Sequence, residues 1–87
     1  MPYYVYILLC SDGTFYTGST SDLKRRVRQH ENGSLHRAYT YSRRPVKLIW
    51  SQEFATKDEA KAGEKKVKNW KREKKEGLLR SAGEQAS

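Results

Sequence analysis

The alternation of hydrophobic and polar residues at the start of the chain predicts a β-hairpin. Tyr3 to Cys10 is apolar on both alternating faces, which indicates a central strand covered on both sides. Residues 11–13, Ser-Asp-Gly, are a turn signal, and Thr14 to Gly18 predicts the returning strand.

The length of this turn decides which side chains share a face. A two-residue loop, residues 12–13, would place Tyr6 and Tyr16 on opposite faces of the sheet. A three-residue loop, residues 11–13, pairs Tyr6 with Gly18 and puts both tyrosines on one face. Asp-Gly at the end of such a loop suits a type I turn followed by a left-handed glycine. If the two tyrosines work together, the loop must be odd in length.

A helix is predicted after the hairpin, and a polar segment follows it. The helix signals are a capping box at Ser19–Asp22, a stripe of Leu23, Val27 and His30, and an Asn32-Gly33 ending. Residues 34–44 are polar apart from two tyrosines, with room for a short helical turn.

The second half of the chain predicts one more strand and further helix. Pro45 opens a strand over Val46 to Phe54, and Thr56 with Glu59 forms a capping box for a helix to about Trp70. Residues 71–80 predict another short helix or a kinked continuation. The order ββαβαα is that of an α+β domain with a small three-stranded antiparallel sheet flanked by helices. We expect one domain over residues 1–80 and a disordered tail over residues 81–87.

Composition and charge narrow the class of partner. The formal charge is +8, with 18 Lys and Arg residues against 10 acidic ones, so a polyanion, nucleic acid first, is the expected partner. The alternative is a solvated basic face that only keeps the protein soluble. No apolar run reaches the roughly 20 residues of a membrane span, so no membrane partner is expected. The single cysteine, Cys10, indicates a reduced thiol and a cytoplasmic protein.

Three polar residues lie on or beside the predicted apolar stripes. Arg26 borders the first helical stripe, which fits a snorkelling arginine or a side chain that reaches the sheet. His30 fits a histidine favoured at a helix C-terminus. Glu64 lies inside the apolar face of the later helix, where a carboxylate is costly without a cation. It predicts either an ion pair with Arg26 or a lysine, or a ligand for a hard divalent cation.

Together these residues resemble the GIY-YIG nucleases, and most closely the small single-domain bacterial branch. The two family triplets correspond to residues 4–6, Tyr-Val-Tyr, and residues 16–18, Tyr-Thr-Gly. The family arginine, the histidine one turn later and the metal-binding glutamate correspond to Arg26, His30 and Glu64. Tyr4, Val5 and Thr17 replace residues of the family triplets. The two tyrosines expected to act in catalysis, Tyr6 and Tyr16, are kept, as is Gly18.

The resemblance implies a divalent-metal-dependent endonuclease that hydrolyses DNA phosphodiester bonds, with structure-specific cleavage in DNA repair or recombination as one form. It implies one Mg²⁺ or Mn²⁺ ion on Glu64, charge neutralisation by Arg26, and proton removal from water by Tyr6 or Tyr16 with help from His30. RNA stays open as a substrate, and a protein partner is expected to supply targeting. Expected contacts to nucleic acid are Gly18, Ser19, Lys24, Arg25, Arg37, Arg43, Arg44 and Lys68.

Two other functions remain open on these residues. The chain is alternatively a non-catalytic basic nucleic-acid-binding module, or a structural or partner-binding protein with a vestigial site. Metal-dependent cleavage separates the nuclease from both, and salt-dependent DNA binding separates the second from the third.

Overall fold

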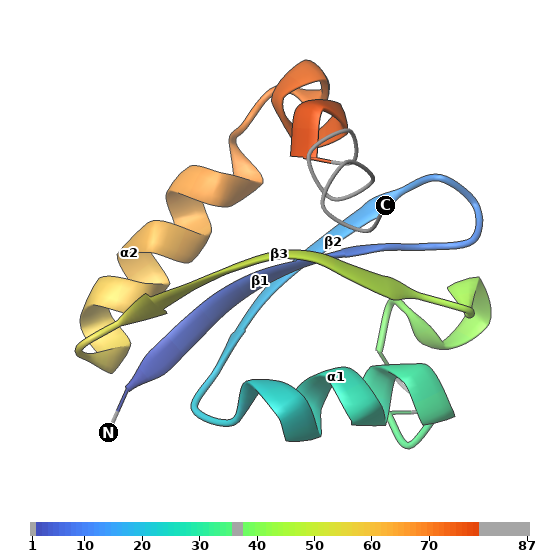
Figure 1. Ribbon diagram of the computed structural model, residues 1–87, viewed down its shortest axis with the longest axis horizontal. Helices are drawn as coiled ribbons and strands as arrows, with labels where there is room; N and C mark the ends of the chain where they lie inside the picture. Colours follow the sequence, from blue (N-terminus) through green and yellow to red (C-terminus); the bar gives the residue numbers. More distant parts are fainter. Residues whose placement is uncertain (1, 36–37, 79–87) are drawn as a thin grey trace, which may run out of the picture.

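The computed structural model describes residues 2–35 and 38–78. Its elements follow the predicted order (Figure 1). They are β1 (Tyr3–Leu9), β2 (Phe15–Thr20), α1 (Leu23–Asn32), the 3-10 turn η1 (Tyr41–Arg43), β3 (Lys47–Phe54) and α2 (Lys57–Lys68), and residues 72–78 are also helical. The predicted α+β fold is therefore confirmed.

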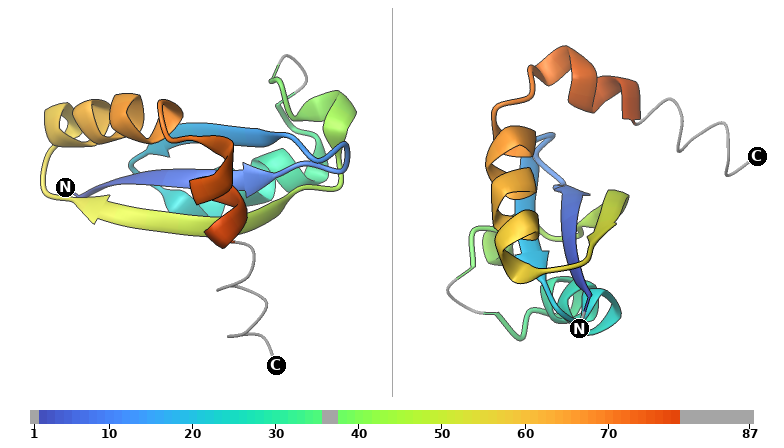
Figure 2. Two further views of the ribbon diagram at one scale, coloured as in Figure 1. Left: turned by 90° about the horizontal axis from the view of Figure 1, so that it is seen from above. Right: turned by 90° about the vertical axis from the view of Figure 1, so that its left-hand side faces the viewer.

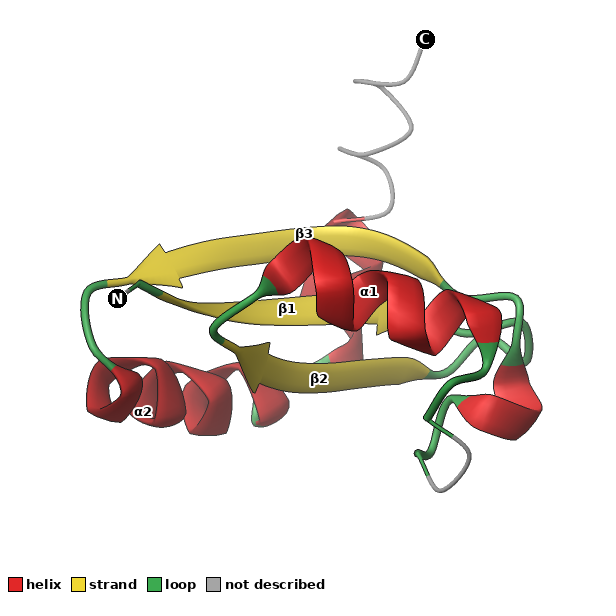
Figure 3. Ribbon diagram, turned by 90° about the horizontal axis from the view of Figure 1, so that it is seen from below, coloured by secondary structure: helices red, strands yellow, loops and turns green. Residues whose placement is uncertain are grey.

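The three strands form one antiparallel sheet in the order β2-β1-β3, so β1 is central and β2 is an edge strand. The sheet lies between α2 on one face and α1 on the other (Figures 1 and 3). Figure 2 shows the helical residues 72–78 on the same side of the sheet as α2.

The alternation of β1 divides the core into two clusters, one on each face of the sheet. Val5 and Ile7 are fully buried in the cluster that holds Ala60 and Val67 of α2. Tyr6 and Leu8 are fully buried in the other cluster, against which Leu23 and Val27 of α1 pack. The prediction of a central strand covered on both faces is confirmed.

The hairpin has the three-residue loop that the shared-face argument required. The Cys10 N–H donates to the Thr14 carbonyl at 2.9 Å, and the Gly13 N–H donates to the Cys10 carbonyl at 3.0 Å. Gly13 adopts φ 83°, a left-handed conformation that glycine reaches without steric cost. As a result Tyr6 faces Gly18, Leu8 faces Tyr16, and the two tyrosines lie on one face of the sheet.

One predicted helix cap is confirmed and the other is wrong. The Thr56 side chain accepts from the Glu59 N–H at the start of α2, as predicted. The predicted cap at Ser19 fails because β2 continues through Ser19 to Thr20. Asp22 is the N-cap of α1, and its carboxylate accepts from the Arg25 N–H at 3.1 Å.

The remaining boundaries differ from expectation by a few residues, which is typical of strand and helix ends. β3 begins at Lys47, and α2 ends at Lys68 with Asn69 as its C-cap. The expectations for Arg37, residues 79–80 and the tail at 81–87 lie outside the described residues.

Candidate active site

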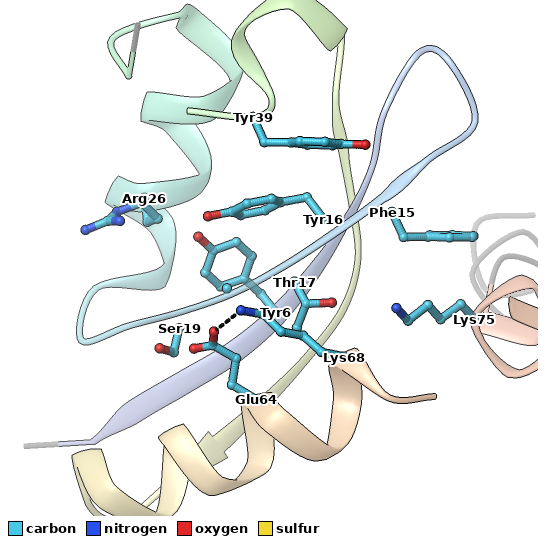
Figure 4. Close-up of a pocket in the computed structure, with 11 residues that line it drawn as sticks. Tyr6, Phe15, Tyr16, Thr17, Ser19, Arg26, Tyr39, Glu64, Lys68 and Lys75 are labelled. Carbon is cyan, nitrogen blue, oxygen red and sulfur yellow. Dashed lines mark ion pairs between the residues drawn. The ribbon is translucent and has the colours of Figure 1, made fainter. Parts of the chain in front are cut away.

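A cavity of about 510 Å³ follows the edge strand β2. Five consecutive β2 residues, Phe15 to Ser19, line it. Because successive strand residues point to opposite faces, the cavity is open to both faces and wraps around the sheet edge. The other lining residues are Tyr6, Arg26, Tyr39, Glu64, Lys68 and Lys75, drawn with the β2 residues in Figure 4.

Tyr6 and Tyr16 meet on the α1 side of this cavity. Their ring centroids are 6.2 Å apart, and Tyr16 also packs on the His30 ring at 5.1 Å. Tyr6 is fully buried, whereas Tyr16 is only partly buried. Burial, followed by the nearby Tyr16 hydroxyl, raises the pKa of Tyr6 well above that of a free phenol. Tyr6 is therefore held in its protonated form.

His30 lies behind Tyr6 and does not itself line the cavity. The Tyr6 hydroxyl is 3.0 Å from His30 Nε2, and the Thr40 hydroxyl is 2.6 Å from His30 Nδ1. Burial, and then the charge of Arg26, lowers the pKa of His30, so its imidazole is neutral. A neutral imidazole has one donor and one acceptor nitrogen, so His30 links the Tyr6 and Thr40 hydroxyls in a buried chain.

Glu64 reaches the cavity from α2, on the opposite side of the sheet. Its side chain is 21% exposed, and Oε2 lies 2.8 Å from the Lys68 ammonium. Burial acts to raise the pKa of Glu64, but Lys68 and the Ser19 hydroxyl outweigh it and hold the pKa below its ordinary value. The prediction of an ion pair with a lysine is confirmed. The carboxylate is charged at neutral pH.

The donor set around Glu64 suits a hard divalent cation. Mg²⁺ prefers oxygen ligands, keeps several waters, and is commonly held by one or two carboxylates together with substrate phosphate. Within the described residues the structure contains no group of three or more His, Cys, Asp and Glu side chains that could enclose a metal ion. Glu64 and the Ser19 hydroxyl match the open, single-carboxylate kind of site. Mg²⁺ and Mn²⁺ both fit this chemistry.

Arg26 supplies positive charge to the α1 side of the cavity. Among the described residues, none forms an ion pair with its guanidinium, yet its charge acts on both Tyr6 and His30. An arginine without an acidic partner among the described residues, lining the same cavity as a carboxylate and two phenols, is suited to an anionic ligand.

The residues predicted to contact nucleic acid fall into three groups: exposed side chains, side chains bonded to other parts of the protein, and residues that line the cavity. Lys24 and Arg25 are exposed in the first turn of α1, which follows the Asp22 N-cap. Arg43 is 3.0 Å from the Asp12 carboxylate, and Arg44 donates to the Tyr41 carbonyl at 2.9 Å. Gly18, Ser19 and Lys68 line the cavity.

Two residues of the 38–43 segment belong to the site but were not predicted from the sequence. Tyr39 stacks on Tyr16 with ring centroids 6.2 Å apart and an interplanar angle of 18°, and the Arg43 guanidinium lies 3.7 Å from the centre of the Tyr39 ring. Thr40 is buried against His30. The only signal was a pair of tyrosines in a polar run, which carries no periodicity.

Comparison with known proteins identifies the family of this chain. The family described as the GIY-YIG catalytic domain matches residues 2–77, nearly all of the described structure. The chain belongs to the GIY-YIG family. GIY-YIG domains have a nuclease fold, so a nucleic-acid substrate and a divalent metal ion are the general expectation for the cavity.

Its relatives include small bacterial proteins of the UPF0213 group. A UPF0213 protein of Streptococcus pneumoniae serotype 4 is 46% identical over 76 residues, covering 87% of this chain and 76% of that protein. UPF0213 protein BH0048 of Halalkalibacterium halodurans is 43% identical over 83 residues, covering 95% and 87%.

Two solved structures share the fold. The solution NMR structure of BH0048 from Bacillus halodurans has a TM-score of 0.55 at 44% identity, covering 91% of this chain and 83% of that one. The solution NMR structure of EF2693 from E. faecalis has a TM-score of 0.60 at 38% identity, covering 93% of this chain and 85% of that one.

Within the described residues, no helix combines the length and hydropathy needed to span a bilayer.

Proposed function

We propose that this GIY-YIG domain is a divalent-metal-dependent endonuclease that hydrolyses phosphodiester bonds in DNA. The observation that carries the proposal is the convergence of Tyr16, Arg26 and Glu64 on one cavity from three different elements. A phenol, a guanidinium and a carboxylate are the groups needed to accept a proton, neutralise phosphate charge and hold a hard cation.

In this proposal Tyr16 is the general base. Tyr6 is fully buried and keeps its proton, whereas Tyr16 is partly exposed and lines the cavity. The Tyr16 phenolate accepts a proton from the attacking water, whose oxygen bonds to phosphorus while the bond to the leaving oxygen breaks. The Tyr6 hydroxyl donates toward the Tyr16 oxygen, which stabilises that phenolate.

The buried chain behind the tyrosines is compatible with this donation in one tautomer of His30. For Tyr6 to donate toward Tyr16, His30 Nε2 must carry the proton and donate to the Tyr6 oxygen. His30 Nδ1 then accepts from the Thr40 hydroxyl. In this arrangement His30 is a positioning residue that selects one orientation of the Tyr6 hydroxyl.

The two charged residues act on the phosphate. Arg26 stabilises the charge that develops on the non-bridging oxygens as water attacks. Glu64 would hold Mg²⁺ or Mn²⁺, which when bound supplies Lewis-acid stabilisation of the phosphate and leaving oxygens. With one carboxylate available, the domain makes one cut at a time, so cleavage of both strands requires two events.

A non-catalytic nucleic-acid-binding module is the second candidate, and one observation favours it. Lys61, Lys65 and Lys68 follow one face of α2 and line a groove of about 360 Å³ with Glu64 and Asn69. Such a row binds phosphates without any cleavage. In either case a cytoplasmic location and a targeting partner remain part of the proposal, as does a role in DNA repair.

The deciding experiment is incubation of the protein with branched and linear DNA in Mg²⁺, Mn²⁺ or EDTA, with RNA of matched structure in parallel. Wild type is compared with Glu64→Gln, and Glu59→Gln, an exposed glutamate at the start of the same helix, is the matched control. We expect metal-dependent cleavage by wild type and Glu59→Gln only. Equal cleavage by wild type and Glu64→Gln, or none by any protein while DNA is still bound, rejects the nuclease proposal.

A further inference from the structure

Lys68 is the cation that contacts the Glu64 carboxylate in this structure. The two residues are one helical turn apart on α2, and Figure 4 shows their side chains pointing toward one another. Lys68 lines both the cavity along β2 and the adjoining lysine groove on α2. Its ammonium therefore lies where the two surfaces meet.

The contact occupies an oxygen that a divalent cation would need. Lys68 Nζ is 2.8 Å from Glu64 Oε2, which is a direct hydrogen-bonded ion pair. A carboxylate that binds a cation through this oxygen cannot keep the ammonium there, because two positive charges at one oxygen repel each other. Lys68 must therefore leave Glu64 when such a cation binds.

The ion pair between Lys68 and Glu64 is also weak enough to be displaced. The Lys68 side chain is 56% exposed and carries its charge on a flexible stem, and ion pairs of this exposed kind are weak. Glu64 is the only acidic residue among the described residues that line the cavity or the lysine groove. A released Lys68 therefore meets no second carboxylate among the described residues of these two surfaces, and Lys61 and Lys65 of the same helix repel it until a phosphate arrives.

We propose that Lys68 is a displaceable counter-ion of Glu64, which neutralises the carboxylate until a divalent cation binds and then contacts a phosphate of the nucleic acid. This inference rests on the proposed function, because it takes Glu64 as the metal ligand and nucleic acid as the substrate. Under this proposal the metal and the nucleic acid bind cooperatively. The metal displaces Lys68 from Glu64 and frees it for a phosphate, and a bound phosphate draws Lys68 away and frees the carboxylate for the metal. Such coupling is reciprocal.

The first test measures Mn²⁺ binding by the loss of the electron paramagnetic resonance signal of free Mn²⁺, without nucleic acid. Wild type is compared with Lys68→Met, Glu64→Gln and the matched control Lys66→Met. Lys66 is an exposed lysine of the same helix that lines a different groove with Phe54 and Gly63. We expect Lys68→Met to bind Mn²⁺ about two- to fivefold more tightly than Lys66→Met, the range that an exposed ion pair supports.

The second test measures DNA affinity by fluorescence anisotropy with and without Mn²⁺, in a Tyr16→Phe background to prevent turnover. We expect Mn²⁺ to raise the affinity of the Tyr16→Phe parent and of its Lys66→Met version, and to raise that of its Lys68→Met version less, because only the direct contact of the metal with phosphate remains there. If Lys68→Met gains as much affinity from Mn²⁺ as the other two, Lys68 is not the coupling group and the proposal is overturned.

The outcomes separate this inference from the proposed function. If Glu64→Gln loses Mn²⁺ binding while Lys68→Met matches Lys66→Met, only the counter-ion proposal fails. If Glu64→Gln binds Mn²⁺ as tightly as wild type, or if no protein binds it, Glu64 is not the metal ligand and both proposals fail. Circular dichroism of each variant establishes that α2 is retained.

Discussion

The Tyr6 hydroxyl oxygen lies 2.5 Å from the point where a Cβ atom would stand on Gly18, its cross-strand neighbour. An alanine at this position also meets the Tyr16 ring at 3.1 Å, so the tyrosine pair must move to admit it. We expect Gly18→Ala to lower the free energy of unfolding by about 1–3 kcal/mol and to abolish cleavage. Denaturant unfolding and a nicking assay measure the two effects.

The matched control for this substitution is Gly77→Ala, because a Cβ at Gly77 meets nothing within 4 Å. Gly77 lies in a helical segment, where alanine is favoured, so its stability should be unchanged or slightly higher. A Gly18→Ala protein that is as stable and as active as Gly77→Ala would show that the close approach at Tyr6 has no functional weight.

The two tyrosines should respond differently to loss of the hydroxyl. Tyr16→Phe removes the proposed base and should abolish cleavage with little change in stability, because this hydroxyl faces the cavity. Tyr6→Phe leaves His30 Nε2 without its buried partner and should cost about 1–3 kcal/mol of stability as well as activity. Thermal unfolding and single-turnover cleavage of both variants test this; a larger stability loss in Tyr16→Phe contradicts the assignment.

The stack of Tyr39 on Tyr16 should matter for rate more than for binding. Tyr39→Ala frees the Tyr16 ring on one side, and such a misplacement of the base should lower kcat by about 10- to 100-fold. Tyr39→Phe keeps the stack and should retain most of the rate. Steady-state kinetics separate kcat from KM for both variants. If phenylalanine loses as much rate as alanine, the hydroxyl and not the ring is the important group.

Protonation of His30 should make stability fall in mild acid. Burial and Arg26 lower the pKa of His30 below its ordinary value of 6.5, so the unfolded chain takes up this proton at a higher pH than the folded protein. The free energy of unfolding therefore decreases as pH falls below about 6.5, until the folded pKa is reached. Urea unfolding from about pH 7 to pH 5 measures this slope, and His30→Gln should flatten it.

The carboxylates should contribute in a separate and lower pH range. The Thr14 hydrogen bonds and the Arg43 charge lower the pKa of Asp12, and that of Glu64 is also lowered, so both stabilise the fold at neutral pH. Their contributions are lost only below the ordinary values of 3.8 and 4.5. The carboxylates therefore do not account for a slope between pH 5 and pH 7. If the His30→Gln protein keeps the full slope in that range, a group other than His30 titrates there.

Binding to nucleic acid should depend steeply on salt. If about five basic side chains reach phosphates, the slope of log K against log[salt] should be about −4 to −5. Arg43 and Arg44 are engaged within the protein, so the exposed lysines of α2 and the exposed basic residues of α1 are the expected contributors. Reversing Lys61 and Lys65 should flatten the slope by about 2 and weaken binding to all sequences alike. Salt-insensitive binding would remove the physical basis for a nucleic-acid partner.

The sequence predicts the sheet and one face of the site because side-chain parity is a strict constraint. Fixing the loop at three residues was enough to bring Tyr6, Tyr16 and Gly18 together, and the structure confirms each pairing. The Thr56 cap was equally readable, because its hydrogen bond is local. These features depend on neighbours in sequence or on an alternation that cannot shift by one residue.

Features that depend on tertiary packing were not readable. Ser19 has the spacing of a cap, but pairing with β1 holds it in the strand, and Asp22 takes the cap. Thr40 meets His30 only because the 38–43 segment folds back along α1. The Glu64–Lys68 pair, by contrast, is local, because the two residues are four apart on α2, a spacing at which helical side chains meet.

The position of β2 at the edge of the sheet has a consequence for inhibition. The cavity is reached around a strand whose outer side pairs with no other strand among the described residues. A peptide that added to β2 as a fourth strand would satisfy its backbone groups and cover the cavity in the same step. The same addition at β3 would leave the cavity open. Strand addition at one edge therefore offers a competitive way to silence this domain without touching a catalytic side chain.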